Sequence, residues 1–172
     1  MTTQEPYCHI RWVISRDMPE VMAIESSAFE FPWTEDEFVR LLLQRNFIGL
    51  ACEYDSQVVG YVFYGLHKTR LRVLNLAVHS DFRGQSVGRT LIYKLIGKLS
   101  HQRRNRLLLE VRESNLSALN FFKAMGFRAT GILRDFYDDT TEDAYAMEYR
   151  VSPPDDPQRA GMPVNRIRHL TG

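Results

Sequence analysis

The chain has 172 residues, 44% of them hydrophobic and 25% charged, and its formal net charge is +1. These values are typical of one globular domain with its own core, and they give no global field that would draw the chain to nucleic acid or to an anionic membrane. There are only two cysteines, and no Cys/His cluster has zinc-site spacing, so a reduced protein without bound metal is expected. The N-terminus has no apolar h-region, and no apolar run reaches the ~20 residues that span a bilayer. The sequence therefore predicts a cytoplasmic protein without a membrane segment.

The first half of the chain predicts one strand, two helices and three further strands. Residues 9–14 alternate as a half-buried strand does, and residues 15–29 follow as a helix with a cap at Ser15 or Asp17 and with Pro19 in its first turn. A second helix, opened by a capping box, and three antiparallel strands are expected at residues 34–44, 47–54, 58–66 and 70–78.

The second half predicts two helices and three strands, at residues 88–100, 106–111, 116–127, 128–137 and 142–151. The element order is that of an α/β (α+β) fold, a mixed central sheet of about seven strands flanked by about four helices. Residues 70–111 form a right-handed βαβ unit with parallel strands. Residues 1–151 make up the domain, and the polar, proline-rich residues 152–172 are expected to be a flexible C-terminal tail.

The stretch "HSDFRGQSVGRTLI", residues 79–92, links a predicted strand to a predicted helix. The N–H groups and dipole of a helix N-terminus favour an anion, and Arg83 and Arg89 add positive charge beside it. Gly84 and Gly88 allow the backbone to approach a ligand. The stretch matches neither the dinucleotide fingerprint nor the P-loop, so by itself it fits a pyrophosphate cradle and a plain strand-to-helix turn about equally.

The segment "NLAVHSDFRGQSVGRTLI" resembles the coenzyme-A loop of the GNAT superfamily of N-acetyltransferases, whose pattern is Arg/Gln-x-x-Gly-x-Gly/Ala. Arg83 and Gly88 match this pattern, whereas Ser86 stands at its first glycine. Three further segments, "AFEFPWTEDEF", "LLLEVRESNLSALNFFKAMGF" and "RDFYDDTTEDAYAM", follow in the family's order. Over about residues 10–150 the chain is similar to the branch that acetylates protein N-termini, above all to the bacterial ribosomal-protein-alanine N-acetyltransferases.

This resemblance implies a GNAT fold, acetyl-coenzyme A as cosubstrate, no metal, and direct transfer of acetyl to the N-terminal α-amine of a protein, with ribosomal proteins as the expected substrates. It implies acetyl-coenzyme A and a protein or peptide N-terminus as partners of a monomer or weak dimer. Neither a membrane nor direct contact with nucleic acid is expected. The coenzyme-binding residues that it implies are Leu76, Ala77, Val78, Arg83, Gly84, Gln85, Ser86, Val87, Gly88, Arg89 and Asn115.

Two of these coenzyme-binding residues have a second interpretation. Asn115 is also a common helix N-cap. At Ser86, a side chain would carry about 1–3 kcal/mol of strain if the loop needs a positive φ, or its hydroxyl would donate a hydrogen bond to a phosphate oxygen. For each of the two residues, the sequence leaves both interpretations open.

Acetyl transfer to an amine calls for a base and benefits from a proton donor for the leaving thiolate. Glu110 interrupts the apolar run "LLLEV"; it is either a base or a structural glutamate that faces solvent or pairs with Arg112 or a backbone amide, and the resemblance places it at the family's catalytic glutamate. Related enzymes often carry a tyrosine where this chain has Phe122, so Tyr137, Tyr145 or a water molecule is expected to serve as the donor.

Residues 135–143 carry five acidic and no basic side chains. They are either a solvated turn or an acidic mouth that attracts a cationic amine. With Tyr137, the aromatic residues Phe31 and Trp33 are expected to contact the acceptor.

Two alternatives to N-terminal acetylation remain. One has the same chemistry with a small amine or a lysine side chain as acceptor. The other is a coenzyme-binding module with weakened catalysis, which Ser86 and Phe122 favour and which Glu110 and the stretch "EDAYAM" oppose.

Overall fold

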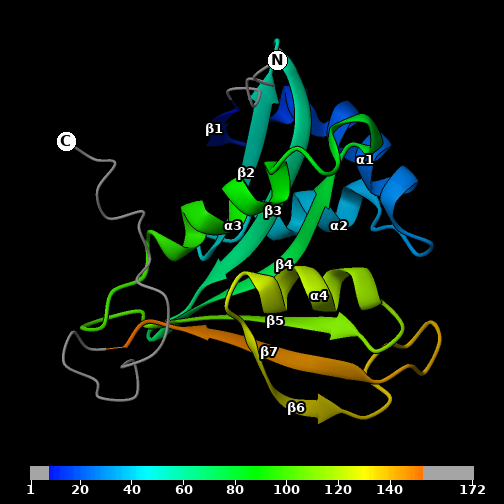
Figure 1. Cartoon of the computed structure of the whole chain (residues 1–172). Helices are drawn as coiled ribbons and strands as arrows, with labels where there is room; N and C mark the ends of the chain where they lie inside the picture. The colour runs from blue at the N-terminus through cyan, green and yellow to red at the C-terminus, as the bar shows by residue number, and fades with distance from the viewer. Residues whose placement is uncertain (1–7, 153–172) are drawn as a thin grey trace, which may run out of the picture.

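The structure is a computed structural model that describes residues 8–152. The expected α/β fold is confirmed: a seven-stranded mixed sheet with four α-helices (Figure 1). The α-helices are α1 (Met18–Ala28), α2 (Glu35–Leu42), α3 (Val87–Ile96) and α4 (Leu116–Ala124). The strands are β1 (His9–Trp12), β2 (Phe47–Tyr54), β3 (Gln57–Leu66), β4 (Arg70–Val78), β5 (Arg106–Arg112), β6 (Arg128–Leu133) and β7 (Ala144–Arg150). The tail expected from residue 152 lies almost wholly outside the described residues.

The sheet has the strand order β1-β2-β3-β4-β5-β7-β6, and only the β4–β5 pair is parallel. β4 and β5 pair only where residues 70–72 lie beside residues 106–108. Beyond that point β4 stays with β3 as far as Val78, and β5 stays with β7 as far as Arg112. The two strands therefore diverge toward their carboxyl ends, and Figure 1 shows the gap widening toward the right.

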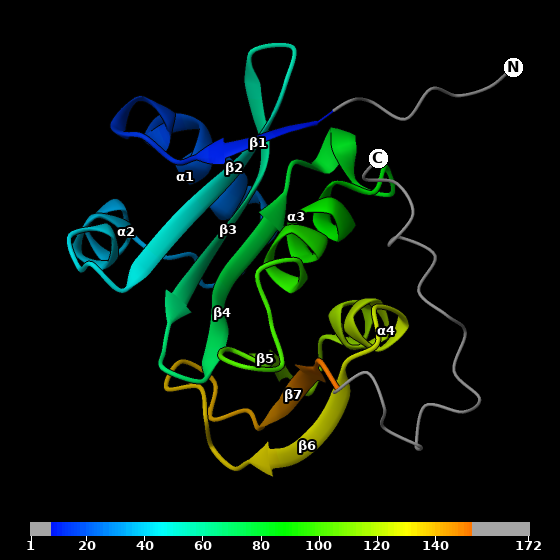
Figure 2. The ribbon, with the colours of Figure 1, turned by 90° about the vertical axis from the view of Figure 1, so that its left-hand side faces the viewer.

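Helices lie on both faces of the sheet. Figure 2 shows α1 and α2 on one side and α3 and α4 on the other. β3 is covered on both faces, and its interior residues are buried almost without interruption. β4 and β5 instead alternate between buried and half-buried residues, because each has a face that no helix covers over its full length.

Two side-chain caps fix the starts of helices next to the cavity described below. Thr34 Oγ1 accepts a hydrogen bond from Glu37 N at 3.3 Å, and Glu37 Oε2 accepts one from Thr34 N at 2.7 Å, so the predicted capping box opens α2. Asn115 Oδ1 accepts from Ala118 N at 3.1 Å and opens α4. Asp17 stands at the N-cap of α1, but its carboxylate is bound by Arg11 instead of the helix.

The last two strands are shorter than the sequence predicts. Residues 134–143 leave the sheet and form a loop between β6 and β7. The loop is held by polar contacts of its own side chains, which polarity alone does not place. As a result, Tyr137 lies in a loop and not at the end of a strand.

The two cysteines lie side by side, contrary to the expectation of reduced thiols. The structure joins Cys8 to Cys52 by a disulfide, with their Cα atoms 5.7 Å apart, a separation at which disulfides form. The sequence does not predict this pairing because 44 positions separate the two residues, and only the pairing of β1 with β2 brings them together. Among residues 8–152, no helix is long and apolar enough to cross a bilayer.

Candidate active site

A cavity of about 810 Å³ opens where β4 and β5 diverge. Its walls come from the α1–α2 connection, the end of β4, the loop before α3, the end of β5, the start of α4 and the β6–β7 loop. The predicted site residues on its walls are Phe31, Trp33, Leu76, Ala77, Val78, Arg83, Gly84, Ser86, Val87, Gly88, Arg89, Glu110, Asn115 and Tyr137. Gln85 and Tyr145 are not among the residues that line it. No group of His, Cys, Asp and Glu in residues 8–152 is arranged to hold a metal ion.

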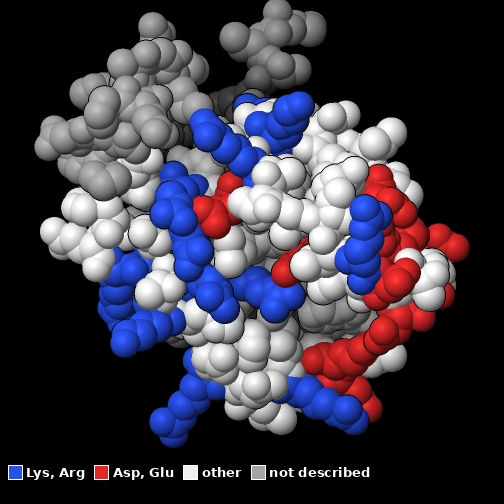
Figure 3. All heavy atoms as spheres, turned by 90° about the horizontal axis from the view of Figure 1, so that it is seen from below, with Lys and Arg blue, Asp and Glu red and all other residues white. Residues whose placement is uncertain are grey.

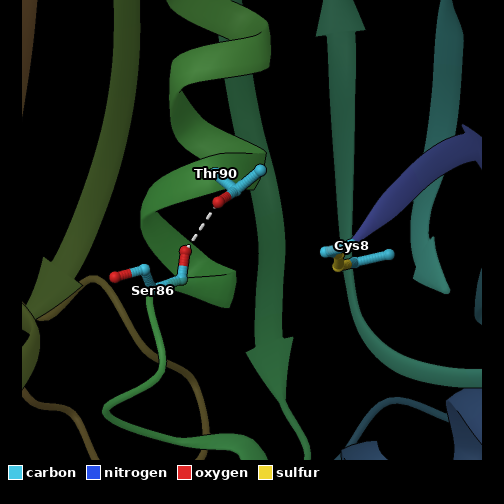
Figure 4. Close-up of a disulfide and its surroundings, with 4 residues drawn as sticks. Cys8, Ser86 and Thr90 are labelled. Carbon is cyan, nitrogen blue, oxygen red and sulfur yellow. Dashed lines mark hydrogen bonds between the residues drawn. A yellow bond between two sulfur atoms is a disulfide. The ribbon is translucent and has the colours of Figure 1, made fainter. Parts of the chain in front are cut away.

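The loop before α3 ends in the left-handed backbone conformation. Gly84 has φ +74° and Ser86 has φ +64°, so the condition under which Ser86 is strained is met. The Ser86 carbonyl accepts hydrogen bonds from the backbone N and from Oγ1 of Thr90, at 2.9 and 2.8 Å (Figure 4). The Ser86 hydroxyl makes no capping bond to the helix. The start of α3 borders the cavity through Ser86, Val87, Gly88 and Arg89. The N–H groups in the first turn of a helix have no partner within the helix, as an anion site requires.

The edge of β4 completes this side of the cavity. Beyond Arg72, no described strand pairs with the β4 edge that faces β5, so its backbone groups are available to an extended ligand. Arg83 bends back and donates from Nε to the Val78 carbonyl at 3.2 Å, which ties the loop to the strand end. A Cβ on Gly88 would meet only side-chain carbons, at 3.5 Å or more. The absence of a side chain there is not needed for packing and leaves room for a ligand.

Glu110 lies on β5 and points to the sheet face that carries Arg72. Arg72 Nη2 is 2.9 Å from Glu110 Oε1, and Arg72 Nε is 3.3 Å from Oε2. The partner of Glu110 is thus Arg72 on the neighbouring strand and not Arg112. Sequence reasoning missed Arg72 because its place beside Glu110 depends on the parallel register of β4 and β5.

Arg112 binds the loop between β6 and β7. Its guanidinium contacts both carboxylate oxygens of Asp139, with Nη1 2.9 Å from Oδ1, and lies 3.7 Å from Glu142 Oε1. The hydrogen bonds from Arg112 lower the pKa of the Asp139 carboxyl, and a bond from Ser114 lowers that of Glu142. Asp143 is bound by Arg134.

The acidic stretch is consequently held in part by arginine side chains, and one of its carboxylates, that of Glu142, lines the cavity. Seen from below, acidic side chains gather on the right, where the α1–α2 and β6–β7 loops lie, and basic side chains extend across the rest of the face (Figure 3). Three of the acidic residues in the stretch, Asp139, Glu142 and Asp143, form ion pairs with arginines. Two arginines, one on β5 and one in the loop, thus pair with three of the five acidic residues, so the negative charge of the stretch is compensated in part.

The two candidate proton donors, Tyr137 and Tyr145, lie in different places. Tyr137 lines the cavity, and burial raises the pKa of its phenol, so it keeps its proton at neutral pH. Tyr145 pairs with Val111 and not with Glu110; because neighbouring residues of a strand point to opposite faces, it lies on the other face and lines a second cavity of about 480 Å³. Phe122 is 7% exposed and packs edge-on against Phe127.

A buried carboxylate next to Trp33, that of Glu25, was not predicted from the sequence. Glu25 on α1 is 1% exposed and lines the cavity. Its Oε1 accepts from Trp33 N at 2.9 Å, and its Oε2 accepts from Asn75 Nδ2 at 3.0 Å and from the Tyr61 hydroxyl. All three donors are neutral. The helical pattern of α1 marks this position only as inward-facing, and Glu25 links α1, the α1–α2 connection, β3 and β4.

Comparison with known proteins identifies the fold's family. Residues 18–127 match the model of the Acetyltransferase (GNAT) family. The chain belongs to the GNAT family. It is therefore an acyltransferase of the N-acetyltransferase class, as the motifs predicted.

Individual relatives of this GNAT chain are similar over most of its length. A protein of Escherichia coli strain K12 named ribosomal protein bS18-alanine N-acetyltransferase is 30% identical over 138 residues, which is 79% of this chain and 93% of that protein. A Bacillus subtilis protein whose name assigns the same activity provisionally is 35% identical over 132 residues, 76% of this chain and 87% of its own. The crystal structure of the E. coli ribosomal-protein-S18-alanine N-acetyltransferase superposes with a TM-score of 0.76 at 27% identity, covering 88% of this chain and 98% of that one.

Proposed function

We propose that the domain of residues 1–151 transfers acetyl from acetyl-coenzyme A to the N-terminal α-amine of a protein, and that the acceptor is a ribosomal protein. The observation that carries this proposal is the place of Glu110 in the cleft between β4 and β5. The start of α3, which suits an anion, lies on one side of it, and Phe31, Trp33 and Tyr137, called the aromatic mouth below, lie on the other. The named activity of relatives at 30–35% identity supports the acceptor class.

The residues present fit a coenzyme-A thioester, which supplies the acetyl group when bound. The start of α3 together with Arg83 and Arg89 suits a pyrophosphate. The unpaired edge of β4, at Leu76–Val78, suits the amides of an extended pantetheine arm. Asn115 caps α4 with its Oδ1, and its amide nitrogen remains available on the cavity wall.

Glu110 is assigned the role of the base that accepts a proton from the attacking amine. An α-amine has a reference pKa of about 7.7–8.0, so a share of it is protonated at neutral pH and must lose a proton before attack. Glu110 receives that proton directly or through one water molecule. The two contacts from Arg72 hold the carboxylate in one orientation, which favours a base that must face the acceptor amine.

The leaving thiolate receives a proton from Tyr137 or from water. Tyr137 is on the cavity wall and protonated, whereas Phe122 has no proton to give and Tyr145 lies on the other face of the sheet. A thiol has a reference pKa of about 8.5, so its thiolate is a tolerable leaving group without an acid. Catalysis therefore depends more on Glu110 than on the donor.

A coenzyme-binding module with weakened turnover is the second candidate, which Phe122 and the strained Ser86 favour. Free-thiol release from acetyl-coenzyme A, measured with peptides that differ in their first residue and with spermidine and free lysine, separates the candidates. We expect release with peptides that have a free α-amine. Release only with the small amines would move the chain to the alternative acceptor class, and coenzyme binding without any release would favour the module.

A further inference from the structure

Arg112 occupies a particular place in the candidate acceptor mouth, and the inference drawn from it rests on the proposed function. It stands two residues after Glu110 on β5, so both side chains leave the same face of the sheet. Its side chain is 25% exposed, and it lines the cavity together with Glu110. It therefore lies one step outward from the assigned base.

The Arg112 guanidinium joins the two aromatic walls of the mouth. Its Cζ lies 3.8 Å from the centroid of the Tyr137 ring and 5.5 Å from that of the Phe31 ring. Both are within the range of a cation–π contact. Phe31 belongs to the α1–α2 connection and Tyr137 to the β6–β7 loop. The Arg112 side chain therefore contacts two segments that are far apart in the sequence.

The same guanidinium compensates part of the negative charge of two carboxylates in the β6–β7 loop, those of Asp139 and Glu142. Besides its contacts with Asp139 and Glu142, Nη1 lies 2.9 Å from Thr140 Oγ1. A planar guanidinium is able to stack on a ring and bind a carboxylate at two points at once, which a lysine ammonium is not. Without Arg112, Asp139 and Glu142 would lose their positive partner, and Glu142 lines the cavity.

The neighbouring Arg134 offers a matched contrast. It also binds an acidic residue of the same loop, Asp143. Its side chain is 76% exposed, and it does not line the cavity. Loss of Arg134 removes a loop ion pair of similar type without touching the walls of the mouth.

We propose that Arg112 is a positioning and specificity-determining residue for the acceptor. It holds Tyr137 and Phe31 as walls for the acceptor's first residues. By compensating part of the charge of Asp139 and Glu142, it also limits the preference of the mouth for a positive charge at the acceptor's second residue.

The test compares kcat/KM for peptides that begin Ala-Ser, Ala-Lys and Ala-Glu, in the full chain and in Arg112→Gln, Arg112→Lys and Arg134→Gln. The unsubstituted chain is expected to use the Lys and Glu peptides within about threefold of each other. Arg112→Gln is expected to raise the Lys-to-Glu ratio by about tenfold at low salt, because Glu142 on the cavity wall and Asp139 beside it lose their positive partner. Most of that preference is expected to disappear at 0.5 M salt.

Arg112→Lys separates charge from stacking. It is expected to restore the charge ratio, while KM for the Ala-Ser peptide stays raised about fivefold or more because the rings lose their planar partner. Arg134→Gln is expected to leave both quantities within about twofold of the unsubstituted chain. A merely structural arginine would lower stability without changing the charge ratio.

Two results would overturn the proposal. An active chain whose charge ratio is the same with and without Arg112, or whose ratio moves equally in Arg134→Gln, removes Arg112 from acceptor selection and leaves the proposed function intact. An unsubstituted chain that binds acetyl-coenzyme A but acetylates none of the peptides removes the proposed function, and this inference with it.

Discussion

Glu110 is the residue on which the proposed chemistry depends most. Replacing it by glutamine keeps the size of the side chain and removes its capacity to accept a proton. We expect Glu110→Gln to lower kcat by about tenfold or more while the affinity for acetyl-coenzyme A stays nearly unchanged.

The control for that variant is Glu148→Gln. Glu148 lies on the same sheet face and pairs with Arg106 and Arg150, but it does not line the cavity, so its loss is expected to leave kcat unchanged. Steady-state kinetics together with a coenzyme titration give both quantities. Full turnover in Glu110→Gln would mean that another group, or water alone, takes the proton.

Ser86 shows how one residue departs from its family's pattern at a cost. A left-handed conformation costs a side chain about 1–2 kcal/mol, part of which glycine loses again through the greater entropy of the unfolded chain. We expect Ser86→Gly to raise the free energy of unfolding by about 0.5–1 kcal/mol and to keep or tighten coenzyme binding. Thermal unfolding and a titration with coenzyme A measure the two effects.

Ser56→Gly is the matched control for Ser86→Gly. Ser56 has φ +63° in the turn between β2 and β3, away from the cavity. It is expected to gain similar stability with no effect on coenzyme affinity. If Ser86→Gly clearly weakens coenzyme binding while Ser56→Gly does not, the Ser86 hydroxyl is a phosphate ligand.

At the scale of the elements, Glu25 joins four segments through one carboxylate. In Glu25→Gln the amide supplies one acceptor oxygen and turns its NH₂ toward a donor, which leaves a buried donor unsatisfied at about 1–3 kcal/mol. We expect thermal unfolding to begin several degrees earlier and KM for the peptide to rise, because Trp33 loses its anchor.

Tyr61→Phe is the matched variant for that network. It removes one donor and leaves the carboxylate bound to Trp33 and Asn75, so its effect on peptide KM is expected to be small. Equal KM values in the two variants would show that Glu25 supports the fold without setting the acceptor wall.

The order of the elements followed from local patterns. The capping box at Thr34, the helical stripe of α3 and the apolar run of β5 are short-range signals, and the structure has each of them. The contacts that place the site are long-range and have no such signal: the pairing of Glu110 with Arg72, the stacking of Arg112 on Tyr137, and the network of Glu25. Tyr145 illustrates the limit, because a shift of one position along β7 decides which face of the sheet a side chain reaches.

For the whole molecule, the decisive feature is the sheet that opens between β4 and β5. Because β4 and β5 pair only over residues 70–72 and 106–108, a cleft opens between their carboxyl ends. The loop before α3, which is proposed to bind the coenzyme, lies on one side of this cleft, and the aromatic residues Phe31, Trp33 and Tyr137 lie on the other. The family motifs predicted residues that line both sides, whereas the divergence that joins them is a property of the complete sheet.

The most direct test of the account is to locate the transferred acetyl group by mass spectrometry. The chain is incubated with acetyl-coenzyme A and a peptide that begins with alanine and contains one internal lysine, beside the same peptide with a blocked N-terminus. The account predicts one acetyl group on the α-amine of the first peptide and none on the second. Acetyl on the lysine of both peptides would contradict it.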